Sequence, residues 1–305
     1  MLSIIITSLN EKPQILNQTI RSILDTSPED IEIIVIDDCS DTPVNLEYKG
    51  KNIKFERNKF RLGAAQSKHN GVTLSSKPYV FLTDAHVLFV PGWHEETLKT
   101  LENKPNSLFC GTCLGLSEGK FDLNQANGAY VGARLFLYDK NDKQILDGKW
   151  INNRKDENNY EISCVMGANY FMHKSHFFKI RGFSELRAWG SEEPCLSLKT
   201  WLSGGEVRLN KDVKIGHMFR DSAPYITNIK EILYNKIRMS KSFFDKEFSD
   251  KLISKIPDDI NKKSALELVG REHKIIEEHK NYYKSIFVRD INWLCEKFKI
   301  EIPEN

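Results

Sequence analysis

The stretch from Tyr79 to His86, Tyr-Val-Phe-Leu-Thr-Asp-Ala-His, restricts the folds open to this chain more than any other feature. Its first half is an apolar run of strand length, which is typical of a strand buried on both faces. Asp84 and His86 follow at its carboxyl end, and an extended backbone turns residues two apart to the same side. A carboxylate and an imidazole suit a divalent cation such as Mn²⁺. The alternative is a plain strand end with a surface histidine.

The first part of the chain alternates strands and helices. β-Branched runs at Ser3–Ser8 and Ile31–Ile36 predict buried strands, and Ile53–Glu56 predicts a third. Apolar residues at helical spacing predict a helix between positions 15 and 24, and a second helix is predicted over Ala64–Leu74. This order is typical of an α/β fold with a mostly parallel central sheet flanked by helices, which builds its sites beyond the carboxyl ends of the strands.

The usual phosphate-binding loops do not occur in this sequence. No G-x-G-x-x-G follows the first strand, and no G-x-x-x-x-G-K-[ST] is present, which weakens a nicotinamide, flavin or P-loop function. A nucleotide can still bind through carboxylates and a metal ion, because a carboxylate accepts a hydrogen bond from a uracil N–H and a metal holds a diphosphate. Asp37 and Asp38, after the second strand, suit this role, and a solvated turn is the alternative.

The middle of the chain is less regular. Leu108–Leu116 and Ala129–Tyr138 predict strands, whereas residues 139–159, rich in Asn, Asp and Lys, predict an exposed loop. Helical spacing returns around Leu198 and ends at a Gly-Gly pair. His217 follows another strand-like run and is therefore a candidate third metal ligand.

The composition changes at about Ile226, after which Gly is rare and apolar residues recur every three or four positions. We therefore expect an α/β domain at residues 1–225 and a helical C-terminal subdomain at residues 226–305. The subdomain carries several basic residues that either contact nucleic-acid phosphates or form a solvated helix face. The net charge of the chain, +2, favours the solvated face. These basic residues are Lys230, Lys236, Arg238 and Lys241.

The composition as a whole is that of a globular protein, since 40% of the 305 residues are hydrophobic and 28% are charged. No apolar run reaches the length of a membrane span and no secretory signal is evident, so we expect a cytoplasmic protein without integral membrane association. Its six cysteines are then reduced thiols. Cys110 and Cys113 form a lone C-x-x-C, which we interpret as buried thiols rather than a redox motif; a zinc site needs a further ligand pair.

Four sequence blocks, taken in order, resemble the catalytic domain of the polypeptide N-acetylgalactosaminyltransferases. These are retaining, metal-dependent enzymes of the GT-A fold, and the chain resembles glycosyltransferase family 2 more loosely. The resemblance covers roughly residues 1–220. It is carried by Ile36–Ser40, by Arg57–Gly71, by Thr83–His86, and by Trp189–Gly205 together with Gly216–Arg220.

The resemblance implies a GT-A nucleotide-diphospho-sugar transferase fold for the α/β domain, a UDP-sugar donor, and Mn²⁺ or Mg²⁺ as cofactor. It also implies roles for matching positions. Nucleotide contacts are implied for Thr7, Glu11, Asp38 and Arg61, with Asp38 on the uracil. Metal ligation is implied for Asp84, His86 and His217. Sugar contacts are implied for Gly167, Lys68 and Glu192, and catalytic roles for Glu192, Trp189, Arg220 and Lys68, with Arg220 near the diphosphate.

The chain also departs from the family. Lys68 stands where the family has a sugar-contacting Arg, so the planar guanidinium fork is lost. Cys195 stands where the family tends to have a carboxylate. The lectin domain and secretory anchor of the family are not recognised in the sequence, so a mucin-type protein acceptor does not follow from the resemblance.

Three functions agree with these residues. The first is transfer of a sugar from a UDP-sugar to an acceptor hydroxyl with retention, in which the leaving phosphate takes the acceptor proton. The second is an inverting family-2 transferase of polysaccharide synthesis, with Glu192 or Glu193 as general base. The third is a non-catalytic relative that binds a nucleotide or a sugar.

The acceptor is expected to be a glycan, or a hydroxylated (hydroxymethyl) base in phage-type DNA. A protein acceptor ranks behind both. The expected location is the cytoplasm of a bacterial cell or of a phage-infected host.

Overall fold

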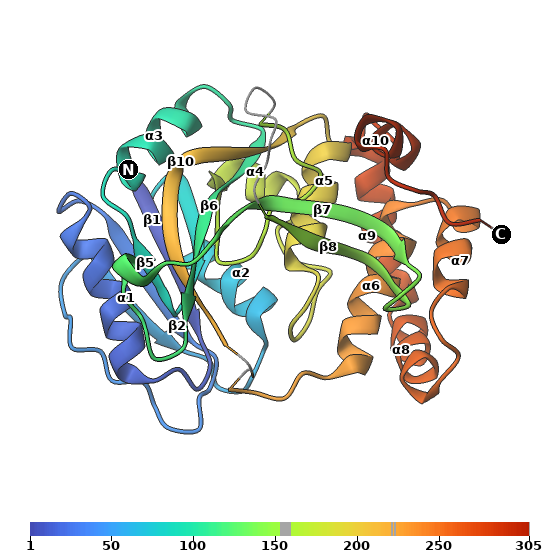
Figure 1. Ribbon diagram of the computed structural model, residues 1–305. Coiled ribbons are helices and arrows are strands. Elements are labelled where there is room, and N and C mark those ends of the chain that lie inside the picture. The colour runs from blue at the N-terminus through green and yellow to red at the C-terminus, as the bar shows by residue number, and fades with distance from the viewer. Residues whose placement is uncertain (153–159, 221, 223, 305) are drawn as a thin grey trace.

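The computed structural model describes residues 1–152, 160–220, 222 and 224–304. In these residues ten strands form one mixed sheet in the order β3-β2-β1-β4-β9-β6-β10-β5, and the hairpin β7–β8 extends from β6 (Figure 1). The strands are β1 (Leu2–Ser8), β2 (Glu32–Asp37), β3 (Ile53–Arg57), β4 (Tyr79–Asp84), β5 (Val87–Phe89), β6 (Ser107–Ser117), β7 (Ala129–Asp139), β8 (Gln144–Asn152), β9 (Asn169–His173) and β10 (Glu206–Phe219).

Helices cover both faces of the sheet. They are α1 (Pro13–Asp25), α2 (Ala64–Leu74), α3 (Trp93–Glu102), α4 (Lys174–Lys179), α5 (Glu192–Leu202), α6 (Ile229–Phe243), α7 (Lys246–Ser254), α8 (Ile260–Arg271), α9 (His273–Ile286) and α10 (Ile291–Phe298). A short 3₁₀ turn, Leu123–Gln125, precedes β7. The predicted α/β class is confirmed, and the early strands and helices lie within one or two residues of their expected bounds.

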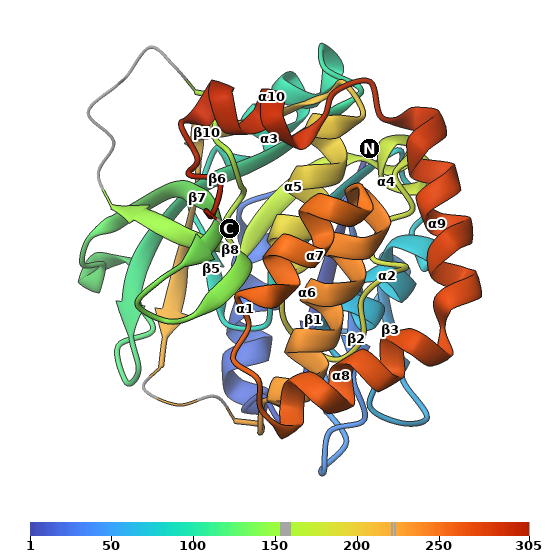
Figure 2. The ribbon, with the colours of Figure 1, turned by 90° about the vertical axis from the view of Figure 1, so that its right-hand side faces the viewer.

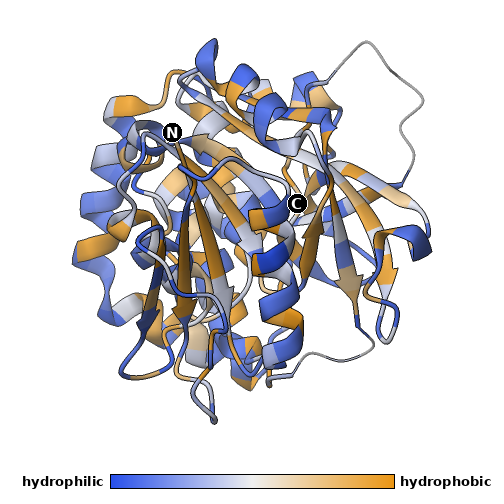
Figure 3. Cartoon of the chain, turned by 90° about the vertical axis from the view of Figure 1, so that its left-hand side faces the viewer, coloured by the Kyte–Doolittle hydropathy of each residue, from blue (hydrophilic) through white to orange (hydrophobic). Residues whose placement is uncertain are grey.

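Alternation along the buried strands divides the hydrophobic core into two layers. In β1, Ile4 and Ile6 belong to the layer under α1 and α3, whereas Ile5 belongs to the layer under α2. This follows from the two-residue period of an extended chain. Figure 3 shows the strands coloured mostly as hydrophobic, as expected for strands covered on both faces.

Parallel pairing brings the polar strand ends together. β1 lies between β2 and β4, and all three run parallel. The register places Thr7 opposite Asp84, and Ser8 opposite Asp37. The carboxyl ends of these strands therefore meet at one edge of the sheet, which is where an α/β fold binds its ligands.

The loop predicted over residues 139–159 is wrong for residues 144–152. β8 (Gln144–Asn152) turns back and pairs antiparallel with β7, so this segment is a hairpin. The strand was missed because β8 is only partly buried. Its polar residues therefore break the alternation of apolar and polar positions that predicts a strand. Residues 153–159 lie outside the described part of the chain.

The C-terminal helices pack on the body of the molecule, and Figure 2 shows α6, α7, α8 and α9 together on one side. Tyr234 and Ile237 of α6 lie in the same hydrophobic layer as Trp201 of α5 and Val165. The expected boundary at residues 225 and 226 falls just before α6, and the division into two units stays a prediction.

Two of the basic residues expected on a solvated face or on phosphates are buried. Lys236 is 2% exposed and pairs with Asp147, and Arg238 is 7% exposed and pairs with Glu272. Their carboxylate partners lie on β8 and next to α9, which the sequence pattern did not reveal. Lys236 and Arg238 therefore neither lie on a solvated helix face nor are free to contact phosphates, and both predictions are wrong for them.

The six cysteines are all free thiols, and Cys110 and Cys113 lie buried in β6. Burial raises the pKa of the Cys110 thiol to about 12, which agrees with an inert structural thiol. Among the helices of the described residues, none has the length and apolar character needed to cross a membrane.

Candidate active site

A cavity of about 1210 Å³ opens at the edge where β1, β2 and β4 end. Its walls come from the N-terminal part of α2, the hairpin β7–β8, the segment at residues 187–194 and the end of β10. The residues assigned by resemblance all line this one cavity, although they come from distant parts of the chain. They are Thr7, Glu11, Asp38, Arg61, Lys68, Asp84, His86, Gly167, Trp189, Glu192, His217 and Arg220.

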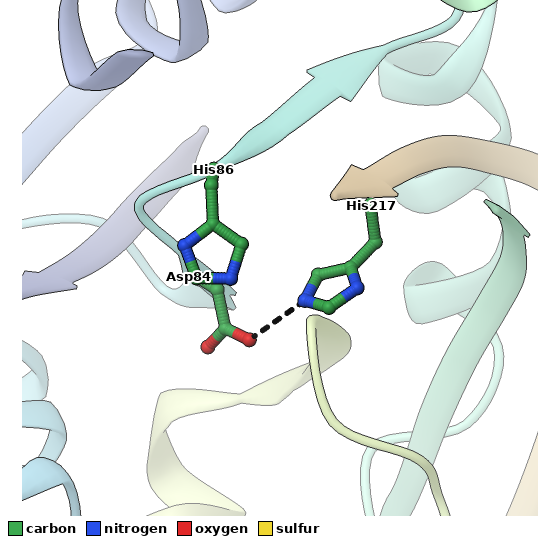
Figure 4. Close-up of side chains that lie close together, drawn as sticks. All are labelled: Asp84, His86 and His217. Atoms are coloured by element: carbon green, nitrogen blue, oxygen red, sulfur yellow. Dashed lines mark ion pairs between the residues drawn. The ribbon is translucent and has the colours of Figure 1, made fainter. Parts of the chain in front are cut away.

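Asp84, His86 and His217 all line the cavity, and their side chains converge (Figure 4). One ligand atom from each lies within 4.8 Å of the others, and Asp84 Oδ2 is 3.5 Å from His217 Nε2. Ligand atoms held on one ion at about 2.1 Å lie roughly 3 Å apart, so small side-chain rotations complete the set. One carboxylate oxygen and two imidazole nitrogens match the preferences of Mn²⁺.

Glu11 contacts both His86 and Arg220 and so links two residues of the candidate site. Its Oε2 lies 2.9 Å from His86 Nδ1, and Arg220 Nη2 donates to its two oxygens at 2.6 and 2.8 Å. A hydrogen bond from Nδ1 leaves Nε2 of His86 free to bind a cation. Burial favours the neutral form of Glu11, but the hydrogen bonds from His86 and Arg220 outweigh it and lower its pKa. The predicted contact of Glu11 with the nucleotide stays a prediction.

Lys68 places a buried cation beside the candidate metal ligands. Its Nζ lies 3.5 Å from Asp84 Oδ1 and 5.2 Å from the centre of the Tyr170 ring, and the side chain is 5% exposed. Burial opposes the charge of Lys68, but the surrounding Tyr170 and carboxylates outweigh it and raise its pKa. Burial likewise favours a neutral Asp84, but Lys68 and the histidines hold the pKa of Asp84 well below its usual range. Asp84 therefore remains an anionic ligand.

Glu192 and Glu193 begin helix α5 at the inner wall of the cavity. Glu192 Oε2 accepts a hydrogen bond from the Gly190 N–H at 2.9 Å. Its Oε1 is buried and lacks a hydrogen-bond partner within the described residues. Burial, and then the charge of Glu193, raise the pKa of Glu192, and burial also raises the pKa of Glu193. The Oε1 of Glu192 is therefore available for a hydrogen bond with a bound molecule.

Asp38 holds the loop that precedes α2. Its Oδ1 accepts from Asn58 Nδ2 and from the Leu62 N–H, both at 2.8 Å, and its Oδ2 accepts from the Gly63 N–H at 2.8 Å. One lone pair of Oδ2 remains for the uracil contact that the resemblance implies. Arg61 is half exposed at the same edge and pairs with Asp41 at 2.5 Å.

Gly167 faces the cavity, and a Cβ placed there would lie 3.4 Å from Glu193 Oε1 and 3.6 Å from Trp150. The protein alone therefore has room for a methyl group at this position, and only a bound sugar would require glycine. Trp189 is 45% exposed at the rim of the cavity.

Sequence reasoning missed several residues that shape the site. Tyr170 lies under Lys68, and Trp150 of β8 packs near His217, with ring centres 6.1 Å apart. Phe219 packs on both Trp150 and His217. Trp150 was overlooked because its strand was interpreted as a loop. For Phe219, the two-residue spacing from His217 along β10 was an available signal.

Comparison with known proteins identifies the family. The family model for glycosyl transferase family 2 matches residues 3–181. Among curated relatives, polypeptide N-acetylgalactosaminyltransferase 3 of Drosophila melanogaster is 27% identical over 73% of this chain and 35% of its own length. Polypeptide N-acetylgalactosaminyltransferase 5 of Caenorhabditis elegans is 24% identical over 80% of this chain and 41% of its own length. The chain thus spans less than half of these relatives.

Two solved structures share the fold. GalNAc-T7, crystallised with UDP, GalNAc and Mn²⁺, superposes with a TM-score of 0.73 at 18% identity, over 98% of this chain and 57% of its own. TarS 1–349 of S. aureus, in complex with UDP-GlcNAc, gives a TM-score of 0.52 at 10% identity, over 82% of this chain and 70% of its own.

The fold and the strand-end cavity define a glycosyltransferase of the GT-A class. Since the family match covers more than half of the residues, the chain belongs to glycosyl transferase family 2. The resemblance to the polypeptide N-acetylgalactosaminyltransferases is confirmed by the curated relatives.

Proposed function

We propose that this protein transfers a sugar from a UDP-sugar to an acceptor hydroxyl, with a divalent cation and with retention at the anomeric carbon. The observation that carries the proposal is the convergence of Asp84, His86 and His217 in the same cavity as Lys68 and Glu192. The relatives named as N-acetylgalactosaminyltransferases, and the neighbour that holds UDP, GalNAc and Mn²⁺, support a UDP-N-acetylhexosamine donor.

Each wall of the cavity has a part in this reaction. A cation on the three ligands, Mn²⁺ or Mg²⁺, supplies positive charge against the diphosphate when bound. Arg220 and Lys68 add fixed positive charge, which stabilises the leaving group as its bond to the sugar breaks. Asp38 orients the uracil, and Glu192 orients a sugar hydroxyl through its free Oε1. Asp38, Lys68 and Glu192 are buried, which limits the access of water to the breaking bond.

The protonation state of Glu192 favours retention over inversion. An inverting enzyme needs an ionised general base on the acceptor. Burial raises the pKa of Glu192 to about 8, so most of this carboxyl is protonated at neutral pH and is not available as a base. In the retaining route the leaving phosphate takes the proton of the acceptor hydroxyl, and no protein base is required.

The acceptor is proposed to be a hydroxyl of a glycan or a peptide, the two kinds that the relatives make reasonable. A hydroxymethylated base in DNA stays a prediction without support from the relatives. Burial of Lys236 and Arg238 removes two of the four basic residues that were candidates for phosphate contacts. The cytoplasmic location also stays a prediction.

The experiment measures release of UDP from a panel of UDP-sugars with Mn²⁺, with chelator, and with Asp84→Ala. We expect one donor to be hydrolysed slowly, and the rate to fall at least about a hundredfold with chelator or in the variant. Asp25→Ala, on the exposed side of α1, is the matched control and should behave as wild type. Metal-independent turnover would overturn the metal site. Binding of UDP and Mn²⁺ without turnover in any acceptor pool would favour a non-catalytic relative.

The stereochemistry is tested on the product itself. With an α-linked UDP-sugar, NMR of the product should show an α-linkage. A β-linkage would overturn retention and would assign the base to Glu192 or Glu193.

A further inference from the structure

The segment that leads into α5 has an unusual backbone. Ala188 and Ser191 have left-handed φ angles of 54° and 77°, and Gly190 between them has φ of 106°. Non-glycine residues adopt such angles only when their surroundings impose them, at a cost of order 1–3 kcal/mol each. This segment carries Trp189 and ends at Glu192, both of which line the cavity. Something must therefore hold residues 187–191 in place.

Asn235 of α6 provides three hydrogen bonds to this segment. Its Oδ1 accepts from the Arg187 N–H at 2.9 Å, and its Nδ2 donates to the carbonyls of Arg187 at 2.8 Å and of Gly190 at 2.9 Å. The side chain of Asn235 is fully buried. A primary amide satisfies one donor and two acceptors of the strained backbone in one contact, which few other side chains can do.

The opposite side of the segment rests on the start of α2. The Ala188 N–H donates to the Leu62 carbonyl at 3.2 Å, and the Ala65 N–H donates to the Ala188 carbonyl at 3.4 Å. These bonds are longer than those from Asn235. The segment is thus clamped between the nucleotide side of the cavity and a helix that lies beyond residues 3–181, the part matched by the family.

Other contacts from the same region strengthen this clamp. The Arg187 guanidinium stacks 4.1 Å from the centre of the Tyr234 ring and pairs with Glu272 at 2.5 Å. The next residue of α6, Lys236, holds the facing wall through Asp147 of β8 at 2.6 Å. Consecutive residues of one helix thus hold two walls of the cavity.

We propose that Asn235 is a positioning residue that fixes the segment at residues 187–191, so that Trp189 and Glu192 face the donor sugar. This inference rests on the proposed function, because it assigns the C-terminal helices a part in building the sugar subsite. The nucleotide end is built from β1, β2 and α2, and the loop before α2 is held by Asp38 rather than by Asn235. Loss of the amide should therefore affect the sugar and spare the UDP moiety.

The test compares Asn235→Ala and Asn235→Leu with wild type. Asn17→Ala is the matched control, because Asn17 is also a buried helix asparagine that holds a loop, through Glu47 N–H at 3.0 Å and the Asn45 carbonyl at 3.4 Å, away from the cavity. Three quantities are measured: the Kd of UDP with Mn²⁺, the KM and kcat for the donor, and amide hydrogen exchange at Arg187.

We expect both Asn235 variants to bind UDP within about twofold of wild type and to raise the KM of the donor about tenfold or more, because buried carbonyls lose their donor. The Arg187 amide should exchange faster in both variants and not in Asn17→Ala. Unchanged donor KM and unchanged exchange would overturn the inference. So would a parallel loss of UDP and donor binding that follows the folded fraction, since it would show a purely structural role.

Failure of the proposed function is distinguishable from failure of this inference. If wild type turns over no donor, the proposed function fails, yet hydrogen exchange at Arg187 still decides whether Asn235 fixes the segment. If wild type is active and Asn235→Ala matches it in donor KM, the inference alone fails.

Discussion

At the scale of single residues, Glu11 shows how one buried carboxylate orients a candidate metal ligand. It joins His86, which lies 75 positions away, to Arg220, which lies 209 positions away. Because one carboxylate receives both partners, the orientation of a predicted metal ligand and the position of a predicted diphosphate contact depend on each other. In this structure Glu11 therefore positions His86 and Arg220 relative to each other.

We predict that Glu11→Gln weakens Mn²⁺ binding by about 10- to 100-fold, because His86 loses the anion that orients its ring. Titration with Mn²⁺ measures this, and Glu47→Gln, at an exposed position, is the control. The pKa of Glu11 is lowered in the folded state, so its ion pairs stabilise the fold above the ordinary glutamate pKa. That contribution is lost as the pH falls through the lowered pKa, and it should be missing in Glu11→Gln. Equal Mn²⁺ affinity in variant and wild type would contradict this role.

Glu192 allows a direct test of its protonation state. Its raised pKa means that its carboxyl is neutral near pH 7, so we predict that Glu192→Gln keeps kcat within about threefold of wild type. The folded state binds this proton more tightly than the unfolded state, so wild-type stability should fall as the pH rises above the ordinary glutamate pKa. Urea unfolding measured between the ordinary glutamate pKa and about pH 8 should show a smaller loss of stability with rising pH in Glu192→Gln than in wild type.

A contrary result for Glu192 has a definite meaning. General bases contribute about 10²-fold or more, so a loss of that size in Glu192→Gln would show that the ionised carboxylate is needed. Such a loss would support the inverting mechanism.

At the scale of secondary-structure elements, the site depends on a close approach between the start of α2 and the segment at residues 187–191. Gly63 lies at this contact with φ of 89°, and a Cβ there would lie 2.1 Å from the Ala188 backbone. Only glycine fits, because it has neither the side chain that would collide nor the steric cost of a left-handed backbone. The Gly63 N–H also donates to Asp38, so this contact couples the proposed uracil side to the proposed sugar side.

We predict that Gly63→Ala lowers the free energy of unfolding by about 2–4 kcal/mol and impairs binding of UDP and of the donor together. Gly50→Ala is the control, since nothing lies within 4 Å of a Cβ at that position. The control should change the free energy of unfolding by no more than about 0.5 kcal/mol. Thermal unfolding and UDP titration of both variants test this, and equal behaviour of the two alanines would contradict the close approach.

At the scale of the whole molecule, one hydrophobic layer joins the sheet to the C-terminal helices. Ile5 of β1, Trp201 of α5, Ile237 of α6 and Leu294 of α10 all belong to it. A buried carboxylate also links the two parts of the chain. Glu185 pairs with Lys199 of α5 at 2.8 Å, and it lies 3.3 Å from His279 of the C-terminal helix α9. A shared core of this kind favours unfolding in a single step.

We predict that Ile237→Ala lowers the stability of the whole chain by about 2–5 kcal/mol, because it opens a cavity in this shared layer. Ile260→Ala, where the side chain is 73% exposed, should change stability by no more than about 0.5 kcal/mol. Denaturation followed by circular dichroism and by tryptophan fluorescence should give coincident transitions for each variant. Two separate transitions would instead support the helices as an independent unit.

The sequence by itself determined the parallel half of the sheet and the residues at its edge. Apolar runs of strand length predict buried strands from the local sequence alone, and Asp84 and His86 fall at the end of such a run. His217 and Glu192 were located by short motifs whose order along the chain is distinctive. Strand runs and short motifs depend only on neighbouring residues, so they can be recognised without knowledge of the fold.

Only the tertiary structure decided how those residues are held. The hairpin that brings Trp150 to the cavity, the pairing of Glu11 with Arg220, and the clamp from Asn235 all join positions far apart in the chain. Lys236 was expected at the surface and is buried, because its partner Asp147 comes from a strand that the pattern did not show. Periodicity records which face of an element is apolar. It does not record which polar group on a distant element will satisfy a buried hydrogen bond or charge.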